Sequence, residues 1–122
     1  MTGTLKKILG QRAEEHALHY LTQHGLSLIS QNFRCKRGEI DLIMRQGEDI
    51  IFVEVRSRSN LTFGHALESI TYAKQRKIMA TAIYFLQHKN WLNRVNFRFD
   101  VVSLSQDNIE WIKDAFSTDI YT

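Results

Sequence analysis

Apolar residues recur near the start of the chain at the spacing of an α-helix. Over residues 5–24 the following side chains fall on one face: Leu5, Leu9, Ala13, Ala17, Tyr20 and Leu21. Gly25 comes directly after this segment, and glycine is a common stop signal for a helix. The pattern therefore predicts an amphipathic helix that ends before Gly25.

Shorter apolar runs with polar breaks follow, and they predict β-strands. The runs cover residues 26–33, 39–45 and 50–58. A basic turn, residues 34–38, separates the first two strands, and a polar break around Gly47 separates the second from the third. Residues 57–68 show no clean period and are predicted to form a loop.

A second helix is predicted from Thr71, which can cap its N-terminus, to about Gln87. Its apolar stripe consists of Thr71, Ile78, Met79, Ala82 and Leu86. Residues 96–104 then predict a strand, residues 105–108 a turn, and residues 109–116 a last strand or short extension. This order predicts one α/β domain over residues 1–122, with helices on a mixed sheet of about five strands.

The predicted hairpin places charged residues on one face of the sheet. If Gly47-Glu48 is a two-residue loop, Asp41 lies opposite Glu54, and Glu39 lies opposite Arg56. Opposed residues share a face, so these side chains are expected to meet. A one-residue slip would mix charged and apolar positions, which supports this register.

The other positions of the hairpin are apolar and predict a core on both sides of it. One face receives Ile40, Leu42, Met44, Ile51, Val53 and Val55. On the charged face, Ile43 and Phe52 continue the row as an apolar patch. This patch predicts that another part of the chain covers the charged face as well.

Carboxylates set among apolar residues are costly unless something pairs with them. Three arrangements relieve the repulsion between Asp41 and Glu54: one of them takes up a proton, a basic side chain bridges them, or a cation binds between them. A structural network would consist of Glu39, Asp41, Glu54, Arg56 and Arg45. The pattern alone leaves this network and a metal site about equally open.

Both predicted helices carry further candidate groups. Glu14 lies at the margin of the first helix's apolar face, where it could reach the same sheet face as Asp41 or pair elsewhere at the surface. Lys74 and Gln75 lie near the N-terminus of the second helix, where backbone N–H groups favour phosphate. Gln75 interrupts the apolar stripe and needs a partner, which a phosphate, a carboxylate or a backbone carbonyl could supply.

Composition and charge limit the possible partners and the cellular location of the protein. The 122-residue chain carries a net charge of +3 at pH 7, which is compatible with a polyanionic partner. No apolar run is long enough to span a membrane, and two lysines between Leu5 and Leu9 argue against a secretory signal. A cytoplasmic protein is therefore expected. The single cysteine, Cys35, excludes an internal disulfide.

The hairpin resembles the signature of the PD-(D/E)xK nuclease superfamily, an Asp on one strand followed by Glu-x-Lys on the next. Here Asp41 is followed by Glu54-Val55-Arg56. More broadly, the chain resembles the bacterial YraN-like family of that superfamily, which is similar in pattern to archaeal Holliday-junction resolvases. The matching motifs, which extend from about residue 10 to residue 104, are Gly10-x-x-x-Glu14-x-x-Ala17-x-x-Tyr20-Leu21, Asn32-x-Arg34, Gly38-Glu39-Ile40-Asp41-Leu42-Ile43, Phe52-Val53-Glu54-Val55, Phe63-Gly64, Lys74-Gln75 and Arg98-Phe99-Asp100-Val101-Val102.

The resemblance implies a restriction-endonuclease-like three-layer fold with a metal site on the sheet. Asp41 and Glu54 would be the main ligands of Mg²⁺ or Mn²⁺, joined by the carbonyl of Val55 and by Glu14. Arg56 occupies the position of the usual catalytic lysine. Because arginine stays protonated, it can bind phosphate and stabilise developing charge, but it cannot act as a base.

The implied reaction is metal-dependent hydrolysis of phosphodiester bonds in DNA, including branched or structured DNA. Lys74 is the candidate for the missing ammonium group, Gln75 for a second contact from the helix, and Glu39 for a residue that supports the ligands. Two rival functions stay open, and Arg56 favours both. One is a nuclease-fold module that binds nucleic acid or a protein partner without cleaving, and the other is a structural protein with a closed salt-bridge network.

Substrate contacts are expected to go to phosphates rather than bases, since no base-reading helix is evident. The candidate residues are Arg34, Lys36, Arg37, Arg58 and Lys77. DNA binding is therefore expected to be independent of sequence and to weaken steeply with salt. The resemblance to resolvases is also compatible with a homodimer, because a four-way junction is two-fold symmetric.

Overall fold

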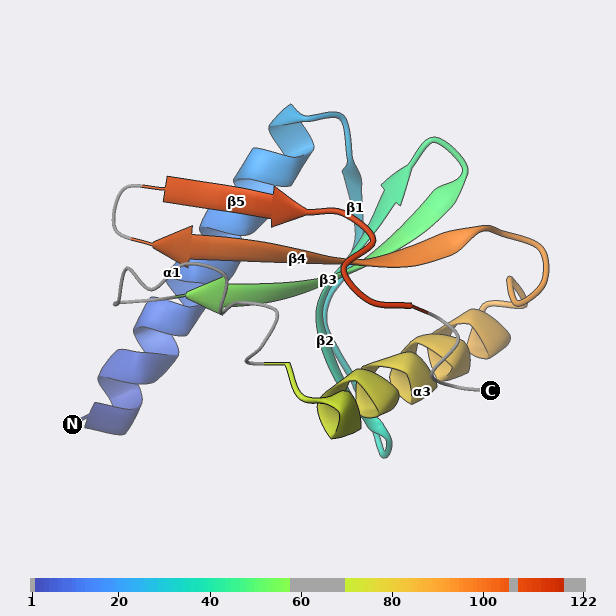
Figure 1. The fold of residues 1–122 in the computed structure, drawn as a ribbon, viewed down its shortest axis with the longest axis horizontal. Helices are drawn as coiled ribbons and strands as arrows, with labels where there is room; N and C mark the ends of the chain where they lie inside the picture. Colours follow the sequence, from blue (N-terminus) through green and yellow to red (C-terminus); the bar gives the residue numbers. More distant parts are fainter. Residues whose placement is uncertain (1, 58–69, 106–107, 118–122) are drawn as a thin grey trace.

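A five-stranded mixed sheet with a helix on each face forms the fold (Figure 1). The computed structural model describes residues 2–57, 70–105 and 108–117, with side chains described from Gly10 onwards. The strands are β1 (Ser27–Cys35), β2 (Gly38–Gln46), β3 (Asp49–Ser57), β4 (Phe97–Ser105) and β5 (Asn108–Ile112), and the helices are α1 (Thr2–Gln23) and α3 (Tyr72–His88). The predicted α/β fold with a mixed sheet is thus confirmed.

The strands follow one another across the sheet in sequence order, from β1 to β5. β1, β2 and β3 form an antiparallel meander, and β5 is antiparallel to β4. β3 and β4 are parallel, so the chain must cross from one end of the sheet to the other between them, and α3 lies in that crossover.

The predicted elements agree with the observed ones, apart from small shifts at their ends. Gly25, with a φ of +95°, follows α1 as expected. The Thr71 hydroxyl caps α3 by accepting a hydrogen bond from the Lys74 N–H at 3.2 Å. Most of the predicted loop over 57–68, including Arg58, lies outside the described residues. Neither described helix is long and apolar enough to cross a membrane.

The register of the hairpin between β2 and β3 is the predicted one. Leu42 pairs with Val53, and Ile43 pairs with Phe52. Gly47 has a φ of +60°, the left-handed conformation that a two-residue hairpin loop requires at its first position. The local turn and the apolar pattern therefore agree on one register, as the sequence predicts.

β2 leaves β3 at Asp41. The ladder between the two strands ends at the pair of Leu42 and Val53. Beyond it, the Asp41 carboxylate takes the place of a backbone acceptor, because its Oδ2 accepts the Val55 N–H at 2.8 Å. The regular alternation of side chains between the two faces is interrupted at this point.

Two predictions for the start of β2 are wrong because the ladder ends there. Ile40 packs on the α3 side of the sheet, whereas strict alternation places it with Leu42 on the other side. The same alternation predicts Glu39 opposite Arg56. Glu39 instead pairs with Arg34 across β1, with 3.4 Å between Arg34 Nε and Glu39 Oε1.

Two apolar clusters hold the layers together, one under each helix. The α1 cluster contains Ala13, Ala17, Leu21, Leu26, Leu42, Met44, Ile51, Val53, Val102 and Leu104. The α3 cluster contains Ile40, Ile43, Ile50, Phe52, Ile70, Ile78, Met79, Ala82, Phe85, Leu86, Phe99, Val101 and Phe116. Both faces of the central strands are thus covered, which confirms the prediction and explains why β3 is apolar on both faces.

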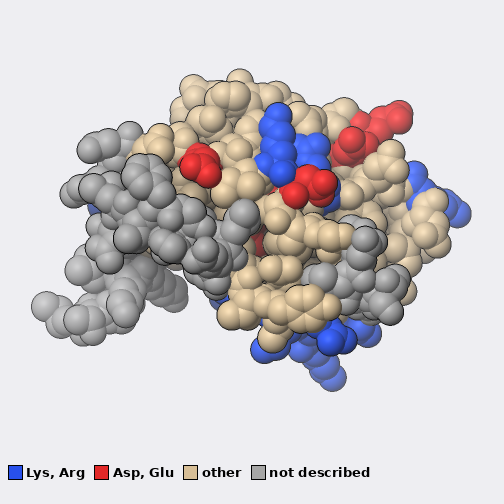
Figure 2. All heavy atoms as spheres, viewed as in Figure 1, with Lys and Arg blue, Asp and Glu red and all other residues tan. Residues whose placement is uncertain are grey.

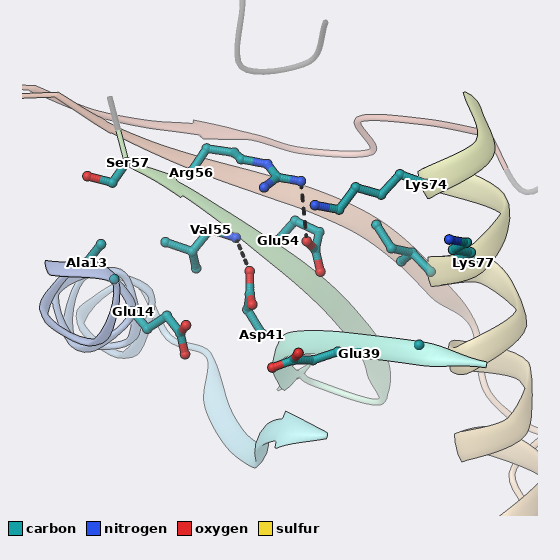
Figure 3. Close-up of a pocket in the computed structure, with 13 residues that line it drawn as sticks. Ala13, Glu14, Glu39, Asp41, Glu54, Val55, Arg56, Ser57, Lys74 and Lys77 are labelled. Atoms are coloured by element: carbon teal, nitrogen blue, oxygen red, sulfur yellow. Dashed lines mark hydrogen bonds and ion pairs between the residues drawn. The ribbon is translucent and has the colours of Figure 1, made fainter. Parts of the chain in front are cut away.

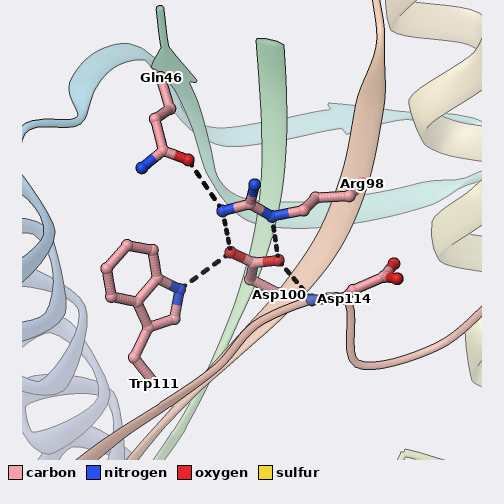
Figure 4. A network of polar contacts seen from close by, with 5 residues as sticks. All are labelled: Gln46, Arg98, Asp100, Trp111 and Asp114. Carbon is pink, nitrogen blue, oxygen red and sulfur yellow. Dashed lines mark hydrogen bonds and ion pairs between the residues drawn. The ribbon is translucent and has the colours of Figure 1, made fainter.

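A buried carboxylate fastens β5 and the segment after it to β4 (Figure 4). Asp100 is fully buried and accepts hydrogen bonds from Arg98 Nε at 2.9 Å, Trp111 Nε1 at 2.9 Å and the Asp114 N–H at 2.9 Å. Arg98 Nη2 also donates to Gln46 Oε1 at 3.0 Å. Every partner belongs to the fold itself, so this carboxylate is structural.

We expect Asp100→Asn to lower the free energy of unfolding by about 3 kcal/mol or more, because it removes the buried charge and turns one acceptor into a donor that faces other donors. Urea unfolding followed by tryptophan fluorescence measures this loss. The matched control is Asp114→Asn, since the exposed Asp114 contributes its backbone N–H to the network. A loss below about 1 kcal/mol in Asp100→Asn would contradict the structural role.

Candidate functional site

A pocket of about 280 Å³ opens where β2 and β3 separate (Figure 3). Both helices and both strands contribute to its wall. The lining residues are Gly10, Ala13 and Glu14 of α1, Gly38, Glu39 and Asp41 of β2, Glu54, Val55, Arg56 and Ser57 of β3, and Lys74, Lys77 and Ile78 of α3. The pocket therefore joins the two helical layers around the end of the ladder, and it gathers most of the residues predicted for the site.

Asp41 is held in place by the backbone of β3. Its Oδ2 accepts the Val55 N–H at 2.8 Å, and its other oxygen makes no hydrogen bond within the described residues. Burial raises the pKa of the Asp41 carboxyl, although the Val55 N–H and the charge of Arg56 act against this rise. One carboxylate oxygen of Asp41 is thus committed to the fold, and the other remains for a ligand.

Glu54 is the most deeply buried acid of the pocket, with 5% of its surface exposed. Its Oε1 has no hydrogen-bond partner among the described residues. Burial raises the pKa of Glu54 to about 8, and the nearby charge of Asp41 adds to the rise. The charges of Arg56 and Lys74 lower this pKa but do not compensate for the burial.

Arg56 lies beside Glu54 without closing a salt bridge of hydrogen-bond length. Arg56 Nη2 is 3.7 Å from Glu54 Oε2, which is too long for a hydrogen bond. Arg56 Nε and Nη2 are buried and have no hydrogen-bond partner among the described residues. Donors and acceptors that stay unsatisfied within the described residues are compatible with a site that binds a ligand.

The donor set fits a divalent cation bound by few protein groups. Asp41 and Glu54 each have one carboxylate oxygen that makes no hydrogen bond within the described residues. The carbonyl of Val55 points to the same edge of β3 as its N–H, toward Asp41, where β2 no longer pairs with it. Within the described part of the chain, no group of three His, Cys, Asp or Glu side chains converges to hold an ion alone. The arrangement therefore suits Mg²⁺, which usually takes one or two carboxylates and completes its shell with water and phosphate.

Glu14 reaches the pocket from α1. This helix packs on the face of Leu42 and Val53, and the sequence left open whether Glu14 reaches Asp41 or pairs elsewhere at the surface. It contributes to the pocket wall because the strands separate there. Burial raises the pKa of Glu14, and the charge of Asp41 adds to the rise, so the two carboxylates interact across the pocket.

Of the three candidate residues on α3, two reach the pocket and one does not. Lys74 and Lys77 both belong to its wall. Gln75 is outside the lining, and its Nε2 donates to the carbonyl of Ile70 at 3.1 Å. The backbone carbonyl is thus the partner of Gln75, one of the three partners that the sequence left open.

Of the described residues predicted to contact DNA, Lys77 belongs to the pocket wall, and the others lie outside it. Arg34, Lys36 and Arg37 are exposed, and the Arg37 guanidinium lies 5.9 Å from the centre of the Tyr84 ring. Figure 2 shows basic side chains along the lower edge of the molecule, where Figure 1 places the turn between β1 and β2 and the first turns of α3. Acidic side chains occur elsewhere on this face, so charge is mixed over the molecule as a whole.

The pocket wall also contains two glycines that were not predicted as site residues. Gly38 has a φ of +155°, and a Cβ there would lie 2.9 Å from Thr81 Oγ1, so only glycine lets the β1–β2 turn approach α3 this closely. Gly10 lies inside α1, where the sequence offers a signal: glycine is the least favourable helix residue after proline.

Comparison with known proteins identifies relatives over nearly the whole chain. A sequence model of the family described as "Uncharacterised protein family UPF0102" matches residues 13–104. A UPF0102 protein of Methylobacillus flagellatus is 51% identical over 114 residues, covering 91% of this chain and 98% of the relative. A UPF0102 protein of Legionella pneumophila (strain Philadelphia 1) is 47% identical over 109 residues, covering 88% of this chain and 92% of the relative.

One solved structure shows a distant similarity. It is the SfsA protein of Pyrococcus furiosus in complex with Ca²⁺, at 13% identity and a TM-score of 0.32. The match covers 92% of this chain and 63% of that one.

The buried acids of the pocket make the stability of the metal-free protein depend on pH. The pKa of Glu54 is about 8 in the folded protein and near 4.5 when the chain is unfolded, so the folded state binds the extra proton between these values. Stability should therefore fall as the pH rises from about 5 to about 8. We expect Glu54→Gln, measured by urea unfolding in EDTA, to flatten most of this slope and to stabilise the protein at pH 8.

The matched control is Glu15→Gln on the exposed side of α1, which should keep the slope of the unaltered protein. If Glu54→Gln keeps the whole slope, Glu54 does not hold a proton in the folded protein at neutral pH.

Proposed function

The chain belongs to the UPF0102 family, and we propose that it is a metal-dependent endonuclease of the PD-(D/E)xK type that hydrolyses phosphodiester bonds in DNA, including branched or structured DNA. One observation carries the proposal. The same pocket holds a buried carboxylate oxygen, Glu54 Oε1, and buried guanidinium nitrogens of Arg56, and none of these atoms has a hydrogen-bond partner among the described residues. A cation satisfies the first and a phosphate satisfies the second.

The charged side chains of the pocket wall are suited to bind a cation and an anion at the same time. The wall contains four carboxylates, Glu14, Glu39, Asp41 and Glu54, and three cationic side chains, Arg56, Lys74 and Lys77. A divalent cation between Asp41 and Glu54 would favour the ionised form of both acids, which burial opposes. The cationic side would then remain free to bind phosphate.

Arg56 and the two lysines of α3 suit a phosphate rather than a carboxylate of the protein. A guanidinium can bind two phosphate oxygens at once, and lysine acts as a point charge. Burial of Arg56 Nε and Nη2 strengthens such contacts, because water does not screen them.

The pocket is small, with a volume of about 280 Å³. One phosphate with its metal and water fits, while the rest of a nucleic-acid strand continues over the surface. The choice of DNA follows the resemblance of the hairpin to the nuclease superfamily.

In the proposed reaction, Asp41, Glu54 and the Val55 carbonyl hold the metal. When bound, Mg²⁺ or Mn²⁺ lowers the pKa of a coordinated water and polarises the scissile phosphate. Arg56 binds the phosphate and stabilises the charge that develops on its oxygens. Lys74 supplies the ammonium group that nucleases of this type usually carry at the position of Arg56. Its role is to orient the attacking water.

The remaining basic residues extend the interaction with DNA. Lys77 lies in the pocket wall, and Lys36 and Arg37 lie in the adjacent turn. They contact phosphates, so binding is independent of base sequence. A homodimer is the assembly that would match a two-fold symmetric junction.

A binding module without cleavage is the second candidate function. The observation that favours it is Arg56 itself, which stands where nucleases of this type usually carry a lysine able to exchange a proton. Such a module would keep the metal and the phosphate site and differ only in the rate of hydrolysis.

We expect isothermal titration with Mn²⁺ to show binding that Asp41→Asn and Glu54→Gln each weaken by roughly tenfold or more, because each removes one charged ligand. Glu15→Gln, at an exposed position of the same chain, should bind like the unaltered protein. If the unaltered protein binds no Mn²⁺, the metal site is wrong.

We expect cleavage of linear, flapped or four-way DNA in Mg²⁺ or Mn²⁺, with a rate reduced roughly a hundredfold or more in Asp41→Asn and Glu54→Gln. Arg56→Lys should retain cleavage, since lysine can also bind phosphate and can exchange a proton. Lys74→Ala should slow it. DNA binding without cleavage by any of these proteins would favour the binding module, and equal cleavage by all of them would reveal a contaminating nuclease.

A further inference from the structure

Gly10 lies in the interior of a helix, and the described residues give no steric reason for glycine there. α1 runs from Thr2 to Gln23, so Gly10 has at least two helical turns on each side. Its φ is not in the positive range that would require glycine. A Cβ built on Gly10 would meet no atom of the described structure within 4 Å. Because glycine weakens a helix relative to alanine, the described part of the fold gains nothing from this residue.

Among the described residues, the space next to Gly10 belongs to the pocket. Gly10 and Ala13 form a wall of small residues, and Glu14 follows one turn after Gly10. The opposite wall carries Lys74 and Lys77 of α3, as Figure 3 shows. Glu54, which is about nine-tenths buried or more and has an oxygen without a partner, lines the floor between the two walls.

We propose that Gly10 is a positioning residue of the substrate site. The missing side chain lets the sugar next to the bound phosphate pass in van der Waals contact with α1, while Lys74 and Lys77 pair with phosphates on the other wall. The strand is thus held between a neutral wall of small residues and a cationic wall. This inference rests on the proposed function, since it names how the same site holds its polynucleotide.

The inference predicts that adding atoms at Gly10 improves the fold and weakens the site. Gly10→Ala should raise the melting temperature by about 2–5 °C, because alanine favours the helix. It should leave Mn²⁺ binding unchanged, and it should lower the affinity for a labelled DNA oligonucleotide, measured by fluorescence anisotropy in Ca²⁺, by roughly tenfold. Gly10→Leu should weaken DNA binding further, since its longer side chain fills more of the pocket.

The matched control is Gln11→Leu, which adds the same side chain to the neighbouring exposed position of α1 outside the pocket wall. It should bind DNA and Mn²⁺ like the unaltered protein. A melting temperature lowered by Gly10→Ala would overturn the inference, because the fold would then use the space. Unchanged DNA affinity in both Gly10 variants would also overturn it.

The outcomes separate this inference from the proposed function. If the unaltered protein binds and cleaves DNA, and both Gly10 variants do so equally well, only the role of Gly10 fails. If the unaltered protein neither binds nor cleaves DNA, the proposed function fails, and the role of Gly10 fails with it.

Discussion

The hydrogen bond from the Val55 N–H to the Asp41 carboxylate marks the place on which the candidate site depends. At 2.8 Å it replaces the backbone pairing of β2 and β3 just where the ladder ends. The separation of the strands leaves the Val55 carbonyl without a β2 partner and opens a passage between the two helical layers. Asp41 thus uses one carboxylate oxygen to hold β3, and its other oxygen is directed to the pocket.

The two buried carboxylate sites show how differently a fold can treat an acid. Asp100 receives hydrogen bonds from two side chains and one backbone N–H, and it is part of the architecture. Glu54 is almost as buried, but one of its oxygens has no hydrogen-bond partner in the described part of the chain, and burial raises its pKa. Leaving a buried acid unsatisfied costs stability, and such costs concentrate at sites that bind ligands.

Membership of UPF0102 places the chain among proteins of similar length whose family name records no activity. The chemical proposal therefore depends on the pocket itself. Its two kinds of unsatisfied group, one anionic and one cationic, lie within one small volume and call for partners of opposite charge. A phosphodiester bound through a metal supplies both partners in one ligand.

The sequence by itself determined the elements, the hairpin register and the identity of the charged face. These features are local, because helix and strand periods and the loop at Gly47 act over a few residues. The register predicts Asp41 opposite Glu54, but the ladder ends before that pair, and Asp41 instead accepts the Val55 N–H. Only the end of the ladder could not be read from it, since the pattern continues past Asp41 as though the strands still paired.

The tertiary structure decided the rest, because it depends on how distant elements pack. The two helices cover opposite faces, so Glu14 enters the pocket from the layer opposite α3. Ile40 turns to the α3 side, and Glu39 pairs with Arg34, because β2 follows β1 after it leaves β3. Gln75 donates a hydrogen bond to the carbonyl of Ile70. Its position in an apolar stripe predicted that it needs a partner but not which one. Periodicity specifies which face a residue occupies only while the strand stays regular, and long-range packing decides where that regularity stops.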